Sequence, residues 1–232
     1  MLKLRKILML LALAGALLLG PGNAPSALAG AQPNPAVVIE TSMGRIIVML
    51  YPDVAPITVA NFLRYVDSNF YNGTIFHRIV KMEVQELSKK DMQQSINIVQ
   101  GGGYIYPLER KQPTWGPIRN EGGAGLLNER GTIAMARSSN PDSAQAEFFF
   151  NVQDNPGLNA IVVNRPDWEI AADPKGKENN VRSVRQGYCP FGRVIRGMDV
   201  VDKMLDVKTT RMGQFQDVPA QPIFIKRMYR AQ

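Results

Sequence analysis

The sequence is short of the residues that much enzyme chemistry requires. Its 232 residues include one cysteine, Cys189, and one histidine, His77. One cysteine excludes an intrachain disulfide and a zinc site built from several cysteines, and one histidine excludes two-histidine metal motifs. We therefore expect neither a metal nor a cofactor. A hydrolase with a Ser nucleophile would have only His77 as its base, and it is kept as one alternative function.

His77 lies between Phe76 and Arg78 in a predicted strand. Alternation along a strand places it on the face opposite to the one that its two neighbours share. With no second histidine, and with Cys189 remote in the sequence, it lacks metal-binding partners. We predict a histidine held inside the structure rather than a ligand or a catalytic base.

A long apolar run is also missing. Three basic residues among the first six precede the uncharged segment Ile7–Leu19, and small residues follow as far as Ala27-Leu28-Ala29. This order predicts a secretory signal peptide over residues 1–29, cleaved after Ala29. The alternative is a membrane anchor, but 13 apolar residues are fewer than the ~20 needed to cross a bilayer. We expect a periplasmic or secreted protein with no stable membrane anchor.

The positive charge is modest once this segment is removed. The whole chain carries +7, and residues 1–29 hold three basic and no acidic residues, so the mature charge is 24 − 20 = +4. These charges are scattered along the sequence. We therefore predict a solvated basic surface and no nucleic-acid partner.

Residues 30–232 read as a single domain that is mainly β. Glycine and proline together make 20 + 16 = 36 residues, which favours a turn-rich fold over a helical bundle. Two amphipathic helices are predicted, one that starts at Pro56 and ends before Asn72-Gly73, and one over Met198–Leu205. Short Val-, Ile- and Phe-rich segments predict strands at 36–40, 45–50, 74–80, 131–137, 148–152, 191–195 and 222–229.

Four further segments lack this rhythm. Residues 81–97 are polar and predict a short surface helix, and residues 160–187 predict a long surface loop. Each is interpreted as a tolerated insertion, and the alternative is a dedicated binding element. The glycines at 101–103 and 122–125 lack the Lys-Ser/Thr of a phosphate loop and the strand–GxGxxG–helix setting, so they predict turns and bulges.

Arg78 and Phe149 each allow two interpretations at this point. Arg78 is a cation in an apolar strand, which suits either an exposed strand face or a fixed guanidinium beside an apolar pocket. Phe149 points to the face opposite Phe148 and Phe150. It suits either plain barrel core or a different, functional surface.

Five blocks of sequence, in order, resemble the cyclophilin-type peptidyl-prolyl cis-trans isomerases. The resemblance covers about residues 36–229, and the sequence is most similar to the bacterial secreted branch of the family. The blocks are Phe76-His77-Arg78-Ile79-Val80, Val99-Gln100-Gly101-Gly102-Gly103, Gly131-Thr132-Ile133-Ala134-Met135-Ala136-Arg137, Glu147-Phe148-Phe149-Phe150-Asn151-Val152 and Phe191-Gly192-Arg193-Val194.

This resemblance implies a closed eight-stranded antiparallel β-barrel capped by two α-helices, with the two insertions as loops. It implies isomerisation of X–Pro bonds in unfolded or exported proteins by a monomer, without cofactor. The alternative on the same fold is a proline-peptide binding or chaperone module with weak turnover.

The resemblance also implies roles for individual residues. Arg78 takes the position of the catalytic arginine, and Gln100 that of the glutamine that contacts the substrate backbone and orients the arginine. Phe149 is the floor of the proline pocket. The remaining implied substrate-binding residues are Ile98, Ala136, Arg137, Ser138, Glu147, Leu158 and Tyr188, of which 136–138 form the edge that binds the residues before proline.

Three departures from the family pattern bear on the pocket. The family's Phe-Met pair falls on Asn97 and Ile98 when read back from Gln100, or on residues 83 and 84 when read forward from Arg78. Neither register supplies the aromatic, so either the proline pocket lacks one wall or Met82 fills it. Glu147 stands where Gln is usual. Gly157 stands where eukaryotic members carry Trp.

Overall fold

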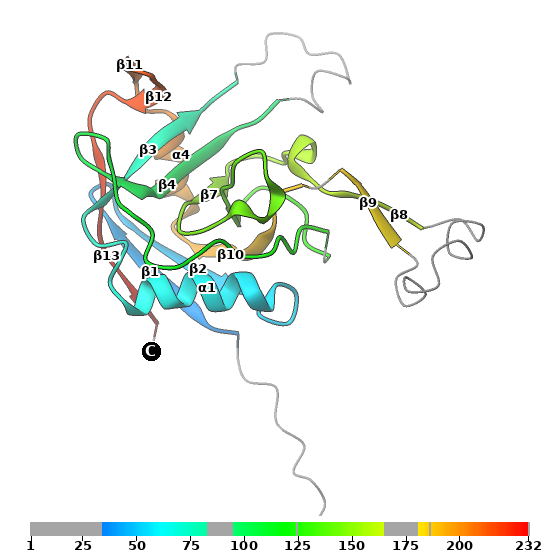
Figure 1. Cartoon of the computed structure of the whole chain (residues 1–232). Coiled ribbons are helices and arrows are strands. Elements are labelled where there is room, and N and C mark those ends of the chain that lie inside the picture. Colours follow the sequence, from blue (N-terminus) through cyan, green and yellow to red (C-terminus); the bar gives the residue numbers. More distant parts are fainter. Residues whose placement is uncertain (1–33, 83–94, 124, 165–180, 186, 232) are drawn as a thin grey trace, which may run out of the picture. The chain divides into compact units, whose positions relative to one another are not determined.

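Eight antiparallel strands close into a barrel (Figure 1). The structure, a computed structural model, describes residues 34–82, 95–123, 125–164, 181–185 and 187–231, all within the compact unit Asn34–Gln232. Around the barrel the strands follow the order β3 (Thr74–Val80), β13 (Ile223–Arg230), β1 (Ala36–Thr41), β2 (Arg45–Leu50), β10 (Pro190–Arg196), β6 (Thr132–Met135), β7 (Phe148–Asn151) and β4 (Ile98–Ile105). Pairing of β3 with β4 closes the barrel, and the two-residue β5 (Glu109–Arg110) extends one edge of β4. The predicted eight-stranded barrel is confirmed.

Both predicted helices are present, and each buries one face in the barrel interior. In α1 (Pro56–Asp67), Pro56 occupies the first turn, and Val59, Phe62 and Val66 are buried at helical spacing. The helix has no side-chain cap of its own. Instead the Glu121 carboxylate accepts hydrogen bonds from the N–H groups of Ile57 and Thr58 at 3.1 and 2.8 Å. In α4 (Met198–Leu205) the buried side chains are Val200, Val201 and Met204.

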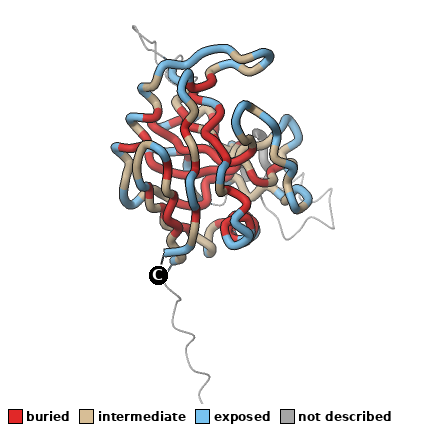
Figure 2. Tube along the Cα trace, turned by 90° about the vertical axis from the view of Figure 1, so that its left-hand side faces the viewer, coloured by how far each residue is buried: buried red, intermediate tan, exposed pale blue. Residues whose placement is uncertain are grey.

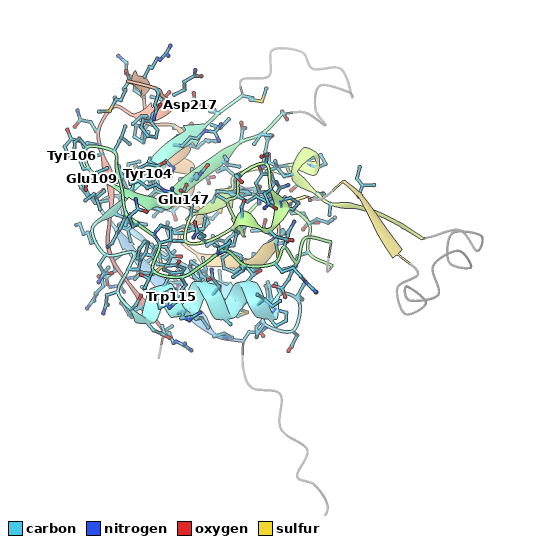
Figure 3. All side chains as sticks on the ribbon, in the orientation of Figure 1. Tyr104, Tyr106, Glu109, Trp115, Glu147 and Asp217 are labelled. Atoms are coloured by element: carbon cyan, nitrogen blue, oxygen red, sulfur yellow. The ribbon has the colours of Figure 1, made fainter. Side chains whose placement is uncertain are left out.

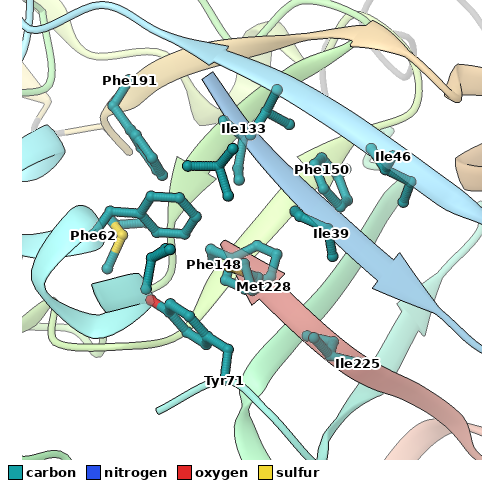
Figure 4. Close-up of a cluster of buried hydrophobic side chains, with 14 of the residues drawn as sticks. Ile39, Ile46, Phe62, Tyr71, Ile133, Phe148, Phe150, Phe191, Ile225 and Met228 are labelled. Carbon is teal, nitrogen blue, oxygen red and sulfur yellow. The ribbon is translucent and has the colours of Figure 1, made fainter. Parts of the chain in front are cut away.

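Aromatic rings fill the interior. Phe62, Tyr71, Phe148 and Phe191 pack with ring centroids 5.0 to 5.7 Å apart along successive contacts (Figure 4). The inner faces of the strands are buried, whereas the connecting segments carry most of the exposed residues (Figure 2). On β7, Phe148 and Phe150 belong to this interior cluster while Phe149 belongs to a second, smaller one. The side-chain period of two in a strand therefore turns Phe149 outward.

The Gly101–Gly103 run forms a bulge inside β4. Ile75 of β3 pairs with Tyr104 and Phe76 pairs with Gly101, so two extra residues of β4 are accommodated between them. Gly102 has a φ of +88° and lies against Phe148 and Tyr71, where a Cβ atom would come within 2.9 Å of both rings. The predicted bulge is confirmed, but the run continues a strand instead of making a turn.

Other segments differ from the sequence-based predictions. The segment 160–187 was expected to be a loop, but Ile161–Asn164 (β8) and Val181–Arg185 (β9) pair as an antiparallel hairpin, because Ile161-Val162-Val163 is a β-favouring run. A second unexpected hairpin joins β11 (Thr209–Met212) to β12 (Phe215–Pro219). Two short 3₁₀ helices, η1 (Pro141–Ser143) and η2 (Pro156–Leu158), complete the elements.

Some predictions concern residues that are not described. The predicted helix within 81–97 falls mainly on residues 83–94, which lie outside the described residues, and 81–82 and 95–97 are not helical. Residues 165–180 and the predicted signal peptide also lie outside them. Within the part of the chain that the structure describes, no helix is long and apolar enough to cross a bilayer.

Candidate active site

Arg78, Gln100 and Phe149 lie directly opposite one another on three neighbouring strands. Arg78 of β3 pairs with Gln100 of β4, and Gln100 pairs with Phe149 of β7. Phe149 pairs in turn with Ala134 of β6. The barrel thus places a guanidinium, an amide and an aromatic ring in one row.

A cavity of about 300 Å³ lies over this row. Phe149, Leu158 and Ile98 are almost fully buried beneath it and, with Ala134, form an apolar cluster separate from the barrel interior. This confirms the non-core interpretation of Phe149. The residues that line the cavity are Arg78, Val80, Met82, Ile96, Ile98, Gln100, Ala136, Arg137, Phe149, Leu158 and Tyr188.

Aliphatic side chains occupy the wall where an aromatic is absent. Met82 lines the cavity together with Ile96 and Ile98. The Asn97 side chain does not line the cavity and makes hydrogen bonds to neighbouring residues. Its Oδ1 accepts a hydrogen bond from the Met82 N–H at 2.7 Å. Its Nδ2 donates to Gln153 Oε1 at 2.9 Å. Ile98, read back from Gln100, is therefore the residue that faces the pocket.

The opposite rim is aromatic and cationic. Tyr188 meets Phe149 edge to face, with ring centroids 5.4 Å apart, and the Arg137 guanidinium lies 4.5 Å from the centre of the Tyr188 ring. Ala136 and Arg137 line the cavity. Ser138 does not, since its exposed hydroxyl and its N–H both bond to Ser143 Oγ, at 2.8 and 2.9 Å.

Arg78 reaches the outer face because of an irregularity at His77. Phe76 pairs with Gly101 and Arg78 with the adjacent Gln100, so His77 is an extra residue on β3. Phe76 consequently faces the barrel interior, and Arg78 faces the cavity. The expectation that these two residues share a face was wrong, because alternation fails where a strand bulges. The Arg78 side chain is about half exposed, and its Nε lies 4.0 Å from Asp217 Oδ2.

His77 is buried, as predicted. Its Nε2 lies 3.4 Å from Glu147 Oε2, and its ring packs against Tyr104 in a tilted arrangement with centroids 4.5 Å apart. Its Nδ1 is buried and has no hydrogen-bond partner among the described residues. A serine nucleophile therefore has no contact with this histidine in the described structure.

Glu147 lies behind Gln100, outside the lining of the apolar cavity. Gln100 Nε2 donates a hydrogen bond to Glu147 Oε2 at 3.0 Å. Burial acts to raise the pKa of Glu147, but the contacts with His77 and Gln100 outweigh it and hold the pKa below its ordinary value. Gly103 makes room for this side chain, because a Cβ atom at position 103 would overlap Glu147 Cγ.

Comparisons with known proteins agree on one family. The family model described as cyclophilin type peptidyl-prolyl cis-trans isomerase/CLD matches residues 36–230. The chain belongs to this family. It is 43% identical over 192 residues to a peptidyl-prolyl cis-trans isomerase of Acinetobacter baylyi, with 83% of each chain covered. It is 40% identical to peptidyl-prolyl cis-trans isomerase B of Escherichia coli, with 82% of this chain and 96% of that protein covered.

Solved structures support the same fold. A cyclophilin-type isomerase of Cryptosporidium parvum superposes with a TM-score of 0.58 at 20% identity, covering 86% of this chain and 98% of that one. The same Cryptosporidium protein, solved in the presence of the dipeptide Ala-Pro, gives a TM-score of 0.58 at 21% identity. This chain is accordingly a peptidyl-prolyl cis-trans isomerase on a cyclophilin barrel.

Sequence reasoning on this isomerase missed Asp217, whose Oδ2 lies 4.0 Å from Arg78 Nε. Asp217 lies on β12, in a polar hairpin with no hydrophobic periodicity to reveal it. Its φ of +58° is a left-handed conformation that Asp and Asn adopt more readily than most residues. No sequence signal linked it to Arg78. Within the described residues, no group of three or more His, Cys, Asp or Glu side chains could hold a metal ion.

Proposed function

We propose that this isomerase accelerates X–Pro rotation through a hydrogen bond from Arg78 to the prolyl nitrogen. The barrier to rotation is ~18–20 kcal/mol and comes from amide resonance. At the twisted midpoint that resonance is lost, and the nitrogen regains a lone pair. A guanidinium at this nitrogen stabilises the midpoint more than either planar isomer, which lowers the barrier with no covalent step and no proton transfer.

The observation that carries this proposal is the row Arg78–Gln100–Phe149. A proline ring seated on Phe149, between Leu158 and Ile98, lies in a low-dielectric cavity whose edge is the Arg78 guanidinium. Low dielectric strengthens a charged hydrogen bond. Gln100 lies between the two, and we assign it the roles of binding the substrate backbone and orienting Arg78.

The segment 136–138 completes the proposed site. We assign its backbone to the residues that precede proline, with Tyr188 as a wall of the pocket. The Ala136 N–H already donates to the Glu147 carbonyl at 2.9 Å, which ties this segment to β7 and fixes its position. On this proposal the protein acts as a monomer.

The substrates we propose are proline-containing segments of unfolded, exported proteins. The support is the sequence of residues 1–29, which has the basic start, short apolar run and A-x-A site of a signal peptide. On this proposal the mature chain begins at Gly30 and acts in the periplasm or outside the cell.

An exchange assay on an X–Pro peptide, paired with a binding titration, tests the mechanism. Arg78→Ala is expected to lower kcat/KM by ~10²–10³, the cost of losing one charged donor to a transition state, while the dissociation constant of the peptide changes little. Arg78→Lys should restore only part of the rate, because an ammonium lacks the planar fork. Turnover within twofold of wild type in Arg78→Ala would overturn the mechanism. Peptide binding without turnover in the wild type would favour the binding or chaperone module instead.

A further inference from the structure

A second cavity adjoins the proline pocket on the other side of Arg78. It has a volume of about 360 Å³ and lies between the β3–β4 pair and the β11–β12 hairpin. Arg78 and Gln100 border both cavities, so the two cavities meet on either side of the proposed catalytic residue. The second cavity is lined by His77, Arg78, Gln100, Tyr104, Glu147, Gln214, Phe215, Gln216 and Asp217.

The two cavities differ in charge. Among the described residues, the proline pocket is bordered by the guanidiniums of Arg78 and Arg137 and by no carboxylate. The second cavity has the carboxylates of Glu147 and Asp217 against the single guanidinium of Arg78. A charge on a bound peptide therefore meets opposite surroundings in the two places.

Asp217 retains capacity for another cation. Its Oδ2 lies 4.0 Å from Arg78 Nε, which is longer than the 2.7–2.9 Å of a charge-assisted hydrogen bond. Its side chain is 43% exposed, so it is open to a ligand. In Figure 3 Asp217 lies at the β12 end of this region, with Tyr104 and Glu147 below it.

Two aromatic rings form the apolar part of the same cavity. Phe215 meets Tyr104 edge to face, with centroids 5.4 Å apart. Tyr104 is fixed from its other side by the buried His77. An aromatic wall next to carboxylates suits a side chain with an apolar stem and a cationic head, because the stem packs on the rings and the head pairs with the carboxylates.

The order of the strands indicates which part of a bound peptide reaches the second cavity. Ala136 of the segment proposed to bind the residues before proline lies on the β6 side of Phe149, and Arg78 and Asp217 lie on the opposite side. A chain that places its proline on Phe149 continues past Arg78 into the second cavity. We propose that this cavity binds the side chain of a Lys or Arg that follows proline, so that Pro-Lys and Pro-Arg sequences are preferred. This proposal rests on the proposed isomerase site.

Peptides that differ at one position test the preference. The set is Ala-Ala-Pro-Lys-Ala, the neutral analogue Ala-Ala-Pro-Met-Ala, and Ala-Lys-Pro-Met-Ala, in which the lysine precedes proline. We expect kcat/KM for the Pro-Lys peptide to exceed that for the Pro-Met peptide by about fivefold, from one exposed ion pair and one cation–aromatic contact. Lysine before proline should bring no gain, because it lies near Arg137. Equal values for Pro-Lys and Pro-Met would overturn the proposal.

Asp217→Asn shows whether this residue supplies the preference. Asn tolerates the left-handed backbone of position 217, so the hairpin is expected to keep its fold. The ratio of the Pro-Lys to the Pro-Met value should fall close to one in this variant. In Asp53→Asn, which removes an exposed carboxylate before α1, the ratio should stay at the wild-type value. A ratio unchanged in Asp217→Asn would overturn the assignment.

Dissociation constants for the same peptides separate this inference from the isomerase mechanism. A Pro-Lys preference in binding together with no turnover would defeat the proposed function but keep the subsite. Turnover of all three peptides at equal affinity and equal rate would keep the proposed function but defeat the subsite.

Discussion

The hydrogen bond from Gln100 Nε2 to Glu147 Oε2, 3.0 Å long, fixes the orientation of the Gln100 amide. An ionised carboxylate can only accept, so the amide nitrogen must face Glu147. The amide oxygen is then turned away from Glu147 and is available to accept a hydrogen bond from a peptide N–H. The resemblance places Glu147 where Gln is usual in the family, and a Gln amide, which can donate or accept, would not dictate this orientation.

Replacements of Glu147 test this relationship. Glu147→Gln keeps a hydrogen-bond partner for Gln100. We therefore expect kcat/KM on an alanine-flanked X–Pro peptide to fall by about threefold or less, which corresponds to less than the free energy of one ordinary hydrogen bond. Glu147→Leu removes the acceptor for both Gln100 and His77, and should lower kcat/KM by about tenfold and the free energy of unfolding by ~1–3 kcal/mol. Exchange kinetics and denaturant titration measure the two effects. A folded Glu147→Leu protein with wild-type kinetics would contradict the role given to this carboxylate.

The row that carries the site could be predicted in part from the sequence. Alternation along Phe148-Phe149-Phe150 shows that Phe149 faces away from its neighbours, but which face is the barrel interior depends on how β7 pairs with β4 and β6. For Arg78, alternation misled, because the bulge at His77 turns the strand by one residue. A bulge is set by pairing with a distant strand and leaves no periodic signal.

The resemblance placed more of the site than periodicity did. It brought Ile98, Gln100, Ala136, Arg137, Leu158 and Tyr188 to the rim of one cavity, and the structure has them there. Glu147 and Ser138 lie beside that cavity instead of in it. Periodicity did not reveal the second cavity, because the β11–β12 hairpin is largely polar, and such strands lack the apolar alternation by which strands are recognised.

The acid stability of the protein should depend on Glu147. Its pKa is lower in the folded state than the ordinary value of 4.5. Ionised Glu147 therefore stabilises the folded state at pH values above about 4.5, and this contribution is lost as the pH falls through the lower, native value. We expect the free energy of unfolding to decline more steeply below pH 5 in the wild type than in Glu147→Gln. Denaturant titrations between about pH 3 and pH 7 compare them, and parallel curves would show that Glu147 does not contribute.

Removal of the insertion between β3 and β4 should leave the barrel folded. Met82 and Ile96, on either side of it, are already joined, since the Ile96 N–H donates to the Met82 sulfur at 3.3 Å. A deletion that extends to Ser95 would go too far, because Ser95 is buried and its hydroxyl accepts a hydrogen bond from Gln153 at 3.0 Å. We expect replacement of residues 84–94 by two glycines to shift Tm by a few degrees at most, because loop-closure entropy changes slowly with length. Loss of the cooperative melt would show that this segment stabilises the barrel.

The amino terminus of the exported protein should be Gly30. The A-x-A site requires a small residue at two positions, and this chain has Ala27 and Ala29 there. Amino-terminal sequencing of protein recovered from the periplasm or medium tests this directly. Replacement of both Ala27 and Ala29 by Leu should block processing and yield a chain that keeps its first 29 residues, whereas Ala31→Leu, beyond the site, should be processed normally. Full-length wild-type chain in the membrane fraction would instead indicate an uncleaved anchor.

Gly157 should make this isomerase resistant to cyclosporin, the cyclic peptide that inhibits many eukaryotic cyclophilins. The resemblance places Gly157 where those members carry a Trp whose indole N–H binds the drug. Here it lies in η2, next to the pocket residue Leu158. Glycine offers neither that donor nor the ~150–250 Å² of aromatic surface, a loss on the order of 2–4 kcal/mol or ~30- to 10³-fold in affinity. Gly157 is not among the described glycines with a positive φ, so its backbone does not require glycine, and Gly157→Trp should recover part of the sensitivity. Inhibition titrations of wild type, Gly157→Trp and the non-donating Gly157→Phe measure the effect, and tight inhibition of the wild type would show that another residue supplies the contact.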